Sequence, residues 1–151
     1  MGINDHSWMA RAYELALKAK EQGEVPIGAV LVDAKNNILS SGWNQVLQLN
    51  DPCAHAELIA IREAATQLQN YRLLDTTLYV TLEPCSMCAG ALVHARVKRL
   101  VFATRDFKAG AAGSVYNLLQ GYPLNHQVII DEGIMQKECA VLLADFFKNR
   151  R

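Results

Sequence analysis

Apolar residues recur every three or four positions near the start of the chain, at Trp8, Ala12, Leu15 and Ala19, and Gly23 follows them. This spacing places the apolar side chains on one face of an α-helix, and a glycine commonly follows the last turn of a helix. Helical spacing and composition predict further helices along the chain. The predicted helices span residues 7–22, 54–68, 85–94, 114–119 and 135–148.

Short runs rich in β-branched and aromatic residues separate these helices, and turn-forming residues bound them. The predicted strands span residues 27–32, 38–43, 77–81, 100–103 and 128–130. Turn-forming residues join the first two strands at positions 33–37, which predicts a β-hairpin. Residues 44–52 are predicted to be a polar loop.

The order of the predicted elements favours an α/β fold. A strand, a helix and a second strand in residues 77–103 predict a right-handed parallel crossover, while the hairpin adds antiparallel pairing. We therefore expect a mixed five-stranded sheet with helices on both faces, which is a three-layer α/β/α domain. The 151 residues are enough for one such domain, residues 1–151, and no repeat or linker divides them.

Composition and charge narrow the class of protein. Hydrophobic residues make up 51% of the chain and aromatic residues 7%, as in ordinary soluble domains. No apolar run reaches the ~18 residues of a membrane span, and the first residues do not read as a signal peptide. We therefore expect a cytoplasmic protein with no membrane partner. The formal net charge is zero, with 15 basic and 15 acidic side chains, which by itself disfavours nucleic-acid binding.

Two cysteines, Cys85 and Cys88, occur where a helix is predicted to begin after Pro84. A Cys-x-x-Cys pair in a reducing compartment is typical of a metal or redox site, and the free N–H groups at a helix start favour the thiolate that binds zinc. His55 is the natural third ligand, because it lies near the predicted start of the preceding helix. A catalytic zinc ion has three protein ligands and keeps its fourth position for water. We therefore predict one Zn²⁺ per chain, bound by these three side chains.

Glu57 follows His55 by two positions and is poorly placed to bind the same ion. A carboxylate beside a zinc-activated water accepts the proton of that water and delivers it to a substrate nitrogen. We therefore predict that Glu57 is the catalytic residue, and that its replacement by Gln leaves zinc bound but slows turnover by several orders of magnitude.

A His-x-Glu motif followed by Pro-Cys-x-x-Cys is the known signature of zinc-dependent deaminases, and residues 55–57 and 84–88 match it. Over nearly the whole chain, from about Trp8 to Phe147, the sequence resembles the bacterial tRNA-specific adenosine deaminases of the cytidine and deoxycytidylate deaminase superfamily. Further matching segments are residues 25–30, 42–44, 51–52, 70–72, 78–85, 87–91 and 110–114.

The resemblance implies a cytidine-deaminase-like fold and a homodimer that converts adenosine to inosine at the wobble position of the tRNA anticodon stem-loop. In that family, zinc-activated water attacks C6 of adenine, and Glu57 would carry protons to the ring and then to the departing amino group. Asn44 would hydrogen-bond the flipped adenine, and Asp106 would lie against the neighbouring nucleotide.

Basic residues gather near the predicted site despite the neutral total charge. Beside a deaminase site they are expected to form a phosphate-binding rim, with Lys108 and Arg150 as RNA contacts. Phe107 is bulkier than the family pattern suggests and is the best candidate for stacking on a base. The rim would comprise five residues within thirteen positions and three at the chain end: Arg96, Lys98, Arg99, Arg105 and Lys108, then Lys148, Arg150 and Arg151.

Two alternative functions remain open from the sequence. The same fold also serves small-molecule deaminases of guanine, cytosine or a nucleotide, which would not need segment 110–114 or the basic rim. A non-deaminating module is the second alternative, either as a closed structural zinc site or as a thioredoxin-like redox pair. The closed site would need a fourth ligand such as Cys53, Cys139 or His94, and the redox pair would leave the histidine and the glutamate without a role.

Overall fold

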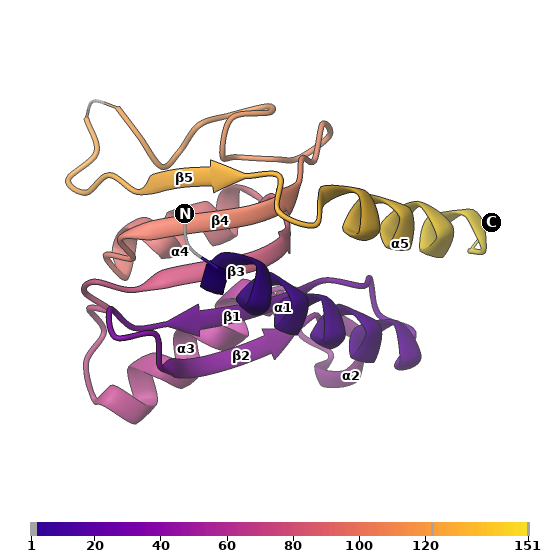
Figure 1. Cartoon of the computed structure of the whole chain (residues 1–151), viewed down its shortest axis with the longest axis horizontal. Helices are drawn as coiled ribbons and strands as arrows, with labels where there is room; N and C mark the ends of the chain where they lie inside the picture. The colour runs from indigo at the N-terminus through magenta and orange to yellow at the C-terminus, as the bar shows by residue number, and fades with distance from the viewer. Residues whose placement is uncertain (1–2, 122, 151) are drawn as a thin grey trace.

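Five strands form one mixed sheet in the order β2-β1-β3-β4-β5 in the computed structural model, which describes residues 3–121 and 123–150 (Figure 1). The pairs β1–β2 and β1–β3 are antiparallel, whereas β3–β4 and β4–β5 are parallel. The expected mixed sheet, hairpin and parallel crossover are therefore confirmed. The strands are β1 (Gly28–Val32), β2 (Ile38–Trp43), β3 (Thr77–Leu82), β4 (Arg99–Thr104) and β5 (Ile129–Glu132).

Helices cover both faces of this sheet. In the described residues they are α1 (Ile3–Glu21), α2 (Val46–Leu49), α3 (Ala56–Leu68), α4 (Ser86–His94) and α5 (Gln136–Lys148). Helices α1 and α5 pack on one face, and α3 and α4 pack on the other (Figure 1). This arrangement confirms the expected three-layer α/β/α fold. No helix in the described ranges is both long and apolar enough to cross a membrane.

Successive residues of the central strands point into two separate cores. Leu78 and Val80 of β3 join the core beneath α3 and α4, whereas Tyr79 between them joins the core beneath α1. Helix α1 approaches β1 so closely that a Cβ atom at Gly28 would lie 2.1 Å from the carbonyl oxygen of Ala12. Only glycine therefore allows this packing of α1 on the sheet.

Helices α3 and α4 both begin at the same edge of the sheet. Strands β2 and β3 run in the same direction because both are antiparallel to β1, and β4 is parallel to β3. The carboxyl ends of these three strands therefore share an edge. Helix α4 begins there directly after β3, and the side chain of Asn44, which follows β2, bonds to the first residue of α3. Open α/β sheets bind their ligands at this kind of edge.

One predicted helix is wrong. Residues 114–119 form turns instead, in which an isolated bridge joins Ala112 to Asn117 and the backbone N–H of Tyr116 donates to the carbonyl of Gly110. These contacts reach back along the chain and satisfy backbone groups that a helix would have paired locally.

The predicted polar loop 44–52 contains the one-turn helix α2. The buried carboxylate of Glu24 accepts hydrogen bonds from the backbone N–H groups of Leu47 and Gln48, so a residue outside the loop caps this helix. The boundaries of the other elements differ from the expected ones by at most four residues.

Candidate metal centre and active site

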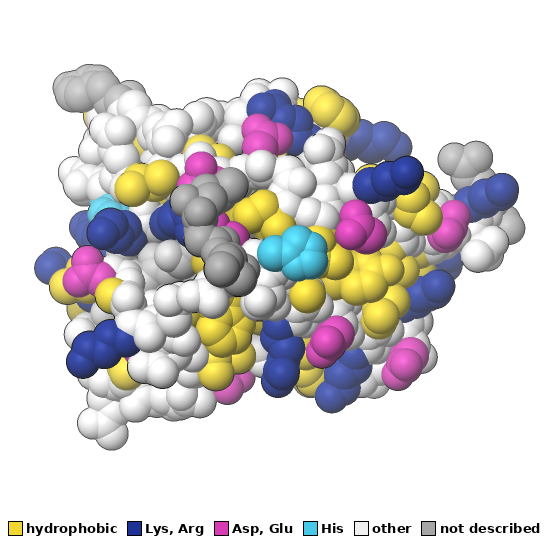
Figure 2. Space-filling view, in the orientation of Figure 1, with side chains coloured by type: hydrophobic (Ala, Val, Ile, Leu, Met, Phe, Trp, Pro, Cys, Tyr) yellow, Lys and Arg dark blue, Asp and Glu magenta, His cyan; other side chains and the backbone are white. Residues whose placement is uncertain are grey.

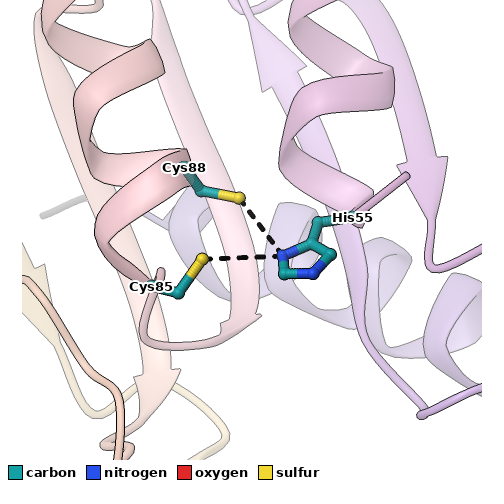
Figure 3. A group of neighbouring side chains, drawn as sticks. All are labelled: His55, Cys85 and Cys88. Carbon is teal, nitrogen blue, oxygen red and sulfur yellow. Dashed lines mark hydrogen bonds between the residues drawn. The ribbon is translucent and has the colours of Figure 1, made fainter. Parts of the chain in front are cut away.

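The side chains of His55, Cys85 and Cys88 converge where α3 and α4 begin (Figure 3). His55 and Cys85 are the extended residues immediately before α3 and α4, and Cys88 lies in the first turn of α4. The Nδ1 atom of His55 is 3.6 Å from Sγ of Cys85 and 3.5 Å from Sγ of Cys88. All three ligand atoms lie within 4.8 Å of one another. The structure therefore brings the three predicted ligands together.

These separations fit a tetrahedral zinc ion. Zinc bonds of about 2.0–2.1 Å to nitrogen and about 2.3 Å to sulfur, at a tetrahedral angle, place the two ligand atoms about 3.5 Å apart. Within residues 3–121 and 123–150, no further His, Cys, Asp or Glu belongs to this cluster, and Cys53, Cys139 and His94 all lie outside it. A metal ion held by these three groups would keep one position for water.

A hydrogen bond between the two thiols shifts their pKa values in opposite directions. The bond with the Cys88 thiol lowers the pKa of Cys85 to about 3, against the effect of burial and with help from His55. The same bond, together with burial, raises the pKa of Cys88. The hydrogen bond with Cys85 also raises the pKa of His55. Zinc binds thiolates and would displace the proton that the two sulfurs share.

Glu57 lies in the first turn of α3 with its side chain only 4% exposed. Its Oε1 atom is buried and has no hydrogen-bond partner among the residues that the structure describes. Burial raises the pKa of Glu57 to about 7. A carboxyl group with an unpartnered oxygen and a pKa near neutrality is suited to moving protons at neutral pH.

Asn44 follows β2 and is almost completely buried. Its Oδ1 atom accepts a hydrogen bond from the backbone N–H of Ala56 at 2.9 Å, so the side chain ties the end of β2 to the start of α3. Because this oxygen is engaged, the amide nitrogen is the part of the side chain that can donate to a substrate. Asn44 is bonded to the residue that follows His55, so its donor hydrogens are held near the predicted metal centre.

Asp106, Phe107 and Lys108 form the tip of the loop that follows β4. The Asp106 carboxylate accepts hydrogen bonds from the backbone N–H groups of Lys108 and Ala109, so it shapes the loop itself. Phe107 is 77% exposed, which leaves its ring open to a partner. A cavity of about 580 Å³ lies between this loop and α5, with Phe107 on one side and Phe147 on the other.

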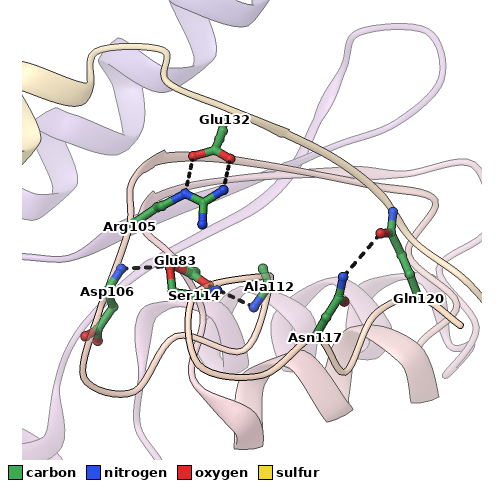
Figure 4. A network of polar contacts seen from close by, with 8 residues as sticks. All are labelled: Glu83, Arg105, Asp106, Ala112, Ser114, Asn117, Gln120 and Glu132. Carbon is green, nitrogen blue, oxygen red and sulfur yellow. Dashed lines mark hydrogen bonds and ion pairs between the residues drawn. The ribbon is translucent and has the colours of Figure 1, made fainter.

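Glu83 is a buried carboxylate at the end of β3 that sequence reasoning missed. It is 2% exposed and accepts hydrogen bonds from the backbone N–H groups of Asp106, Ala112 and Ser114 and from the Ser114 hydroxyl (Figure 4). Burial raises the pKa of Glu83, but these hydrogen bonds together outweigh it, and the net shift is downward. The sequence signal was present, since Glu83 and two of its loop partners, Ala112 and Ser114, fall in segments that match the family.

Five of the basic residues expected to form one rim lie at opposite ends of β4. Arg99 begins this strand and Arg105 follows its end, about 20 Å farther along at the usual rise of a strand. Arg99 pairs with Asp5 and Asp131, and Arg105 pairs with Glu132. On the face shown in Figure 2, basic side chains are scattered among acidic ones. The prediction of a single basic rim is therefore wrong.

The two predicted RNA contacts differ in their freedom. Among the described residues, no acidic side chain forms an ion pair with Lys108. Arg150 donates to the carbonyl oxygen of Gly23, and its guanidinium lies 4.7 Å from the centre of the Phe146 ring. Arg151, the other predicted cation at this end, lies outside the described residues. Lys108 is therefore the freer of the two cations.

Known proteins are similar to this chain in sequence and fold. Residues 3–104 match the family described as the cytidine and deoxycytidylate deaminase zinc-binding region. A tRNA-specific adenosine deaminase from Haemophilus influenzae is 52% identical, over 97% of this chain and 85% of that protein. A structure solved in a study of A-to-I editing by tRNA:A34 deaminases at the wobble position of transfer RNA is 39% identical, with a TM-score of 0.87 over 91% of this chain and 99% of that one. A guanine deaminase from Bacillus subtilis is 40% identical, with a TM-score of 0.65 over 76% of this chain and 71% of that one.

The region matched by the family contains His55, Cys85 and Cys88 together with Glu57 and Asn44. The zinc-binding family and the donor set agree on the cofactor, which confirms the expected Zn²⁺. The relative at 52% identity extends the match to nearly the full length. The chain therefore belongs to the zinc-binding cytidine and deoxycytidylate deaminase family, within the group of the tRNA-specific adenosine deaminases.

Proposed function

We propose that this protein deaminates adenosine to inosine at the wobble position of tRNA anticodons. The observation that carries the proposal is the three-ligand cluster of His55, Cys85 and Cys88, with the buried carboxyl group of Glu57 beside it, whose Oε1 atom has no partner among the described residues. The high identity to a tRNA-specific adenosine deaminase and the close fit to a tRNA:A34 deaminase structure support tRNA as the substrate.

The residues of the site divide the chemistry between them. Zinc bound by the three ligands supplies the Lewis acidity that makes water nucleophilic at neutral pH. Glu57 accepts a proton as water adds to C6 of adenine and delivers it to the ring nitrogen. It then takes the second proton from the added hydroxyl group and delivers it to the amino group, which leaves as ammonia. The amide nitrogen of Asn44 donates to the flipped base and holds C6 at the metal centre.

Contacts with the RNA fall to the loop after β4 and to the chain end. The exposed ring of Phe107 stacks on a neighbouring base, and Lys108 neutralises a phosphate. Asp106 fixes the loop and lies against the nucleotide next to the adenine. Arg150 adds a second phosphate contact from the end of α5. For this, its hydrogen bond to Gly23 and its contact with the Phe146 ring must rearrange.

Three further expectations go with this function. Residues 1–151 act as a single zinc-dependent deaminase domain, in keeping with the one sheet that all five described strands share. The protein works as a homodimer, as the family resemblance implies. It works in the cytoplasm, where tRNA is available to a modifying enzyme.

A free purine base is the alternative substrate. The 40% identity to a guanine deaminase favours this alternative over other small molecules, but that match covers 76% of this chain, against 97% for the tRNA-specific relative. The two functions place different demands on the loop after β4, because only an RNA substrate has phosphates and neighbouring bases for Lys108 and Phe107 to contact.

Ammonia release separates the two substrates. The zinc-loaded protein should release ammonia from an anticodon stem-loop with adenosine at the wobble position, and sequencing of the RNA should show inosine there. Free guanine, cytosine and adenosine should release little. Ammonia from free guanine alone would contradict the proposal. Zinc analysis of the His55→Ala variant completes the test, because retained zinc and unchanged turnover would exclude the assigned metal centre.

A further inference from the structure

Glu83 occupies an unusual place for a carboxylate. It lies two residues before the Cys85 ligand and is 2% exposed, yet none of the described Lys and Arg side chains forms an ion pair with it. A buried charge without a counter-ion is costly unless hydrogen bonds satisfy it. The four hydrogen bonds that this carboxylate accepts all come from the loop after β4 (Figure 4).

The loop closes around Glu83 from both sides. The backbone N–H of Asp106 donates to Oε1 at 3.0 Å, and those of Ala112 and Ser114 donate to Oε2 at 2.9 and 3.0 Å. The Ser114 hydroxyl completes the set at Oε1. Convergent backbone N–H groups of this kind form a cradle for an anion, and here the anion is the protein's own side chain.

Two further features show how closely the loop fits this side chain. A Cβ atom at Gly110 would lie 2.4 Å from Cδ of Glu83, so only glycine allows the loop to pass. The backbone N–H of Ala111 donates to the carbonyl of Pro84 at 2.8 Å. The loop is thus attached to Glu83 and to the residue that directly precedes the Cys85 ligand.

We propose that Glu83 is a positioning residue that holds the loop 105–114 in its RNA-binding shape beside the metal centre. The loop carries Phe107 and Lys108 between its two attachments to Glu83, so its shape decides where both side chains meet the substrate. A preformed loop avoids the cost of ordering those residues during binding. The proposal rests on the proposed function in one respect, since the substrate that meets the loop is taken to be tRNA.

The test uses Glu83→Gln, which keeps the size of the side chain but replaces one acceptor oxygen with an amide nitrogen. Zinc content should stay near one ion per chain. The KM for the stem-loop should rise about 10- to 100-fold, as expected when hydrogen bonds to a charged group are lost, while kcat changes by less than about threefold. A role confined to fold stability would lower the melting temperature without this split between KM and kcat.

Hydrogen exchange provides a readout that does not depend on activity. In Glu83→Gln, the amides of Asp106, Ala112 and Ser114 should exchange at least about tenfold faster, whereas amides of the central strand β3 should keep their protection. Ser114→Ala, which removes one donor and keeps the carboxylate, should show a smaller change in the same direction. This milder variant preserves the test if Glu83→Gln does not fold.

Glu132→Gln is the matched control. Glu132 accepts two hydrogen bonds from Arg105 at the start of the same loop, but it is exposed. Its KM should stay within about twofold of the parent, as expected for an exposed pair. Unchanged loop exchange in Glu83→Gln would overturn the proposal, and so would an unchanged KM in the zinc-loaded variant. If the parent protein releases no ammonia from the stem-loop, the proposed function fails, while the exchange experiment still decides whether Glu83 holds the loop.

Discussion

At the amino end of β3 and β4, the carboxylate of Asp5 is held by Arg99 and Tyr79, whereas at the opposite edge Glu57 keeps a buried oxygen without a partner among the described residues. Both residues are buried, with exposed fractions of 4% each. The two carboxylates differ in what surrounds them.

The Asp5 end is fully paired. Both guanidinium nitrogens Nη1 and Nη2 of Arg99 lie 2.9 Å from the two Asp5 oxygens, and the Tyr79 hydroxyl donates to Oδ1 at 2.6 Å. Arg99 also bonds to Asp131 at 2.8 Å. The hydrogen bond from Arg99 is the main reason that the pKa of Asp5 is lowered, and burial and the bond to Asp5 raise the pKa of Tyr79. This network joins α1, β3, β4 and β5.

The comparison separates stability from chemistry. A buried carboxylate with a complementary cation stabilises its charged form and the fold around it. A buried carboxylate without one is destabilised in its charged form, and the raised pKa of Glu57 reflects this. Enzymes commonly accept such destabilised groups at the site of reaction. Substitutions at the two ends should therefore affect different measurements.

The largest effect is expected for Glu57→Gln. Turnover of the stem-loop should fall about 10³- to 10⁴-fold, because the amide cannot accept the proton of water. Zinc content should stay at one ion per chain, and the free energy of unfolding should not decrease, because a neutral amide is easier to bury than a carboxylate. Metal analysis and denaturant unfolding of the same preparation check both points. Loss of zinc would show that Glu57 is a ligand.

Asp5→Asn should reverse this pattern. Arg99 would lose one charged partner but would keep its ion pair with Asp131, and its side chain is 20% exposed. We therefore expect the free energy of unfolding to fall by about 2–3 kcal/mol, which is less than for a fully buried pair. The turnover rate, measured well below the melting temperature, should stay within about twofold of the parent, in line with a site remote from the chemistry. A large loss of turnover in the folded variant would mean that the two ends are coupled.

Acid should remove the stabilisation from Asp5. Because the pKa of Asp5 is lowered by folding, its contribution is present above the unfolded value of about 4 and is lost as the pH falls through the folded value. The difference in unfolding free energy between the parent and Asp5→Asn should therefore be constant from pH 7 to about pH 5 and shrink below about pH 4. A difference that persists at about pH 2 would mean that Asp5 acts through packing instead of charge.

Much of this molecule was accessible from local sequence patterns. Helices α3 and α4 and strand β3 between them follow local residue patterns, and the three zinc ligands follow from two short motifs. These features depend on residues near one another in the chain. Helix α2 depends instead on Glu24, more than twenty positions upstream of the N–H groups that it caps, so no local pattern predicts it.

The errors have the same origin. Residues 114–119 favour a helix by composition, but the loop is shaped by Glu83, whose carboxylate lies 31 positions before Ser114. The basic rim was inferred from closeness in sequence, and strand β4 carries its two halves to opposite edges of the sheet. An extended strand places residues that are close in sequence far apart in space. A loop that folds back brings residues that are distant in sequence into contact.

The smallest expected effect tests whether the two edges also differ in RNA binding. Lys108→Glu changes an exposed cation near the metal centre, and Lys98→Glu makes the same change at the other end of β4, which is a matched control. Only Lys108 is near the proposed RNA path. Reversal of its charge should therefore weaken stem-loop binding roughly three- to tenfold and reduce the slope of log affinity against log salt concentration by about one. Binding measured at several salt concentrations should leave Lys98→Glu close to the parent. Equal losses in both variants would mean that RNA crosses the whole length of β4, and that the two ends of the sheet share a binding role despite their different carboxylates.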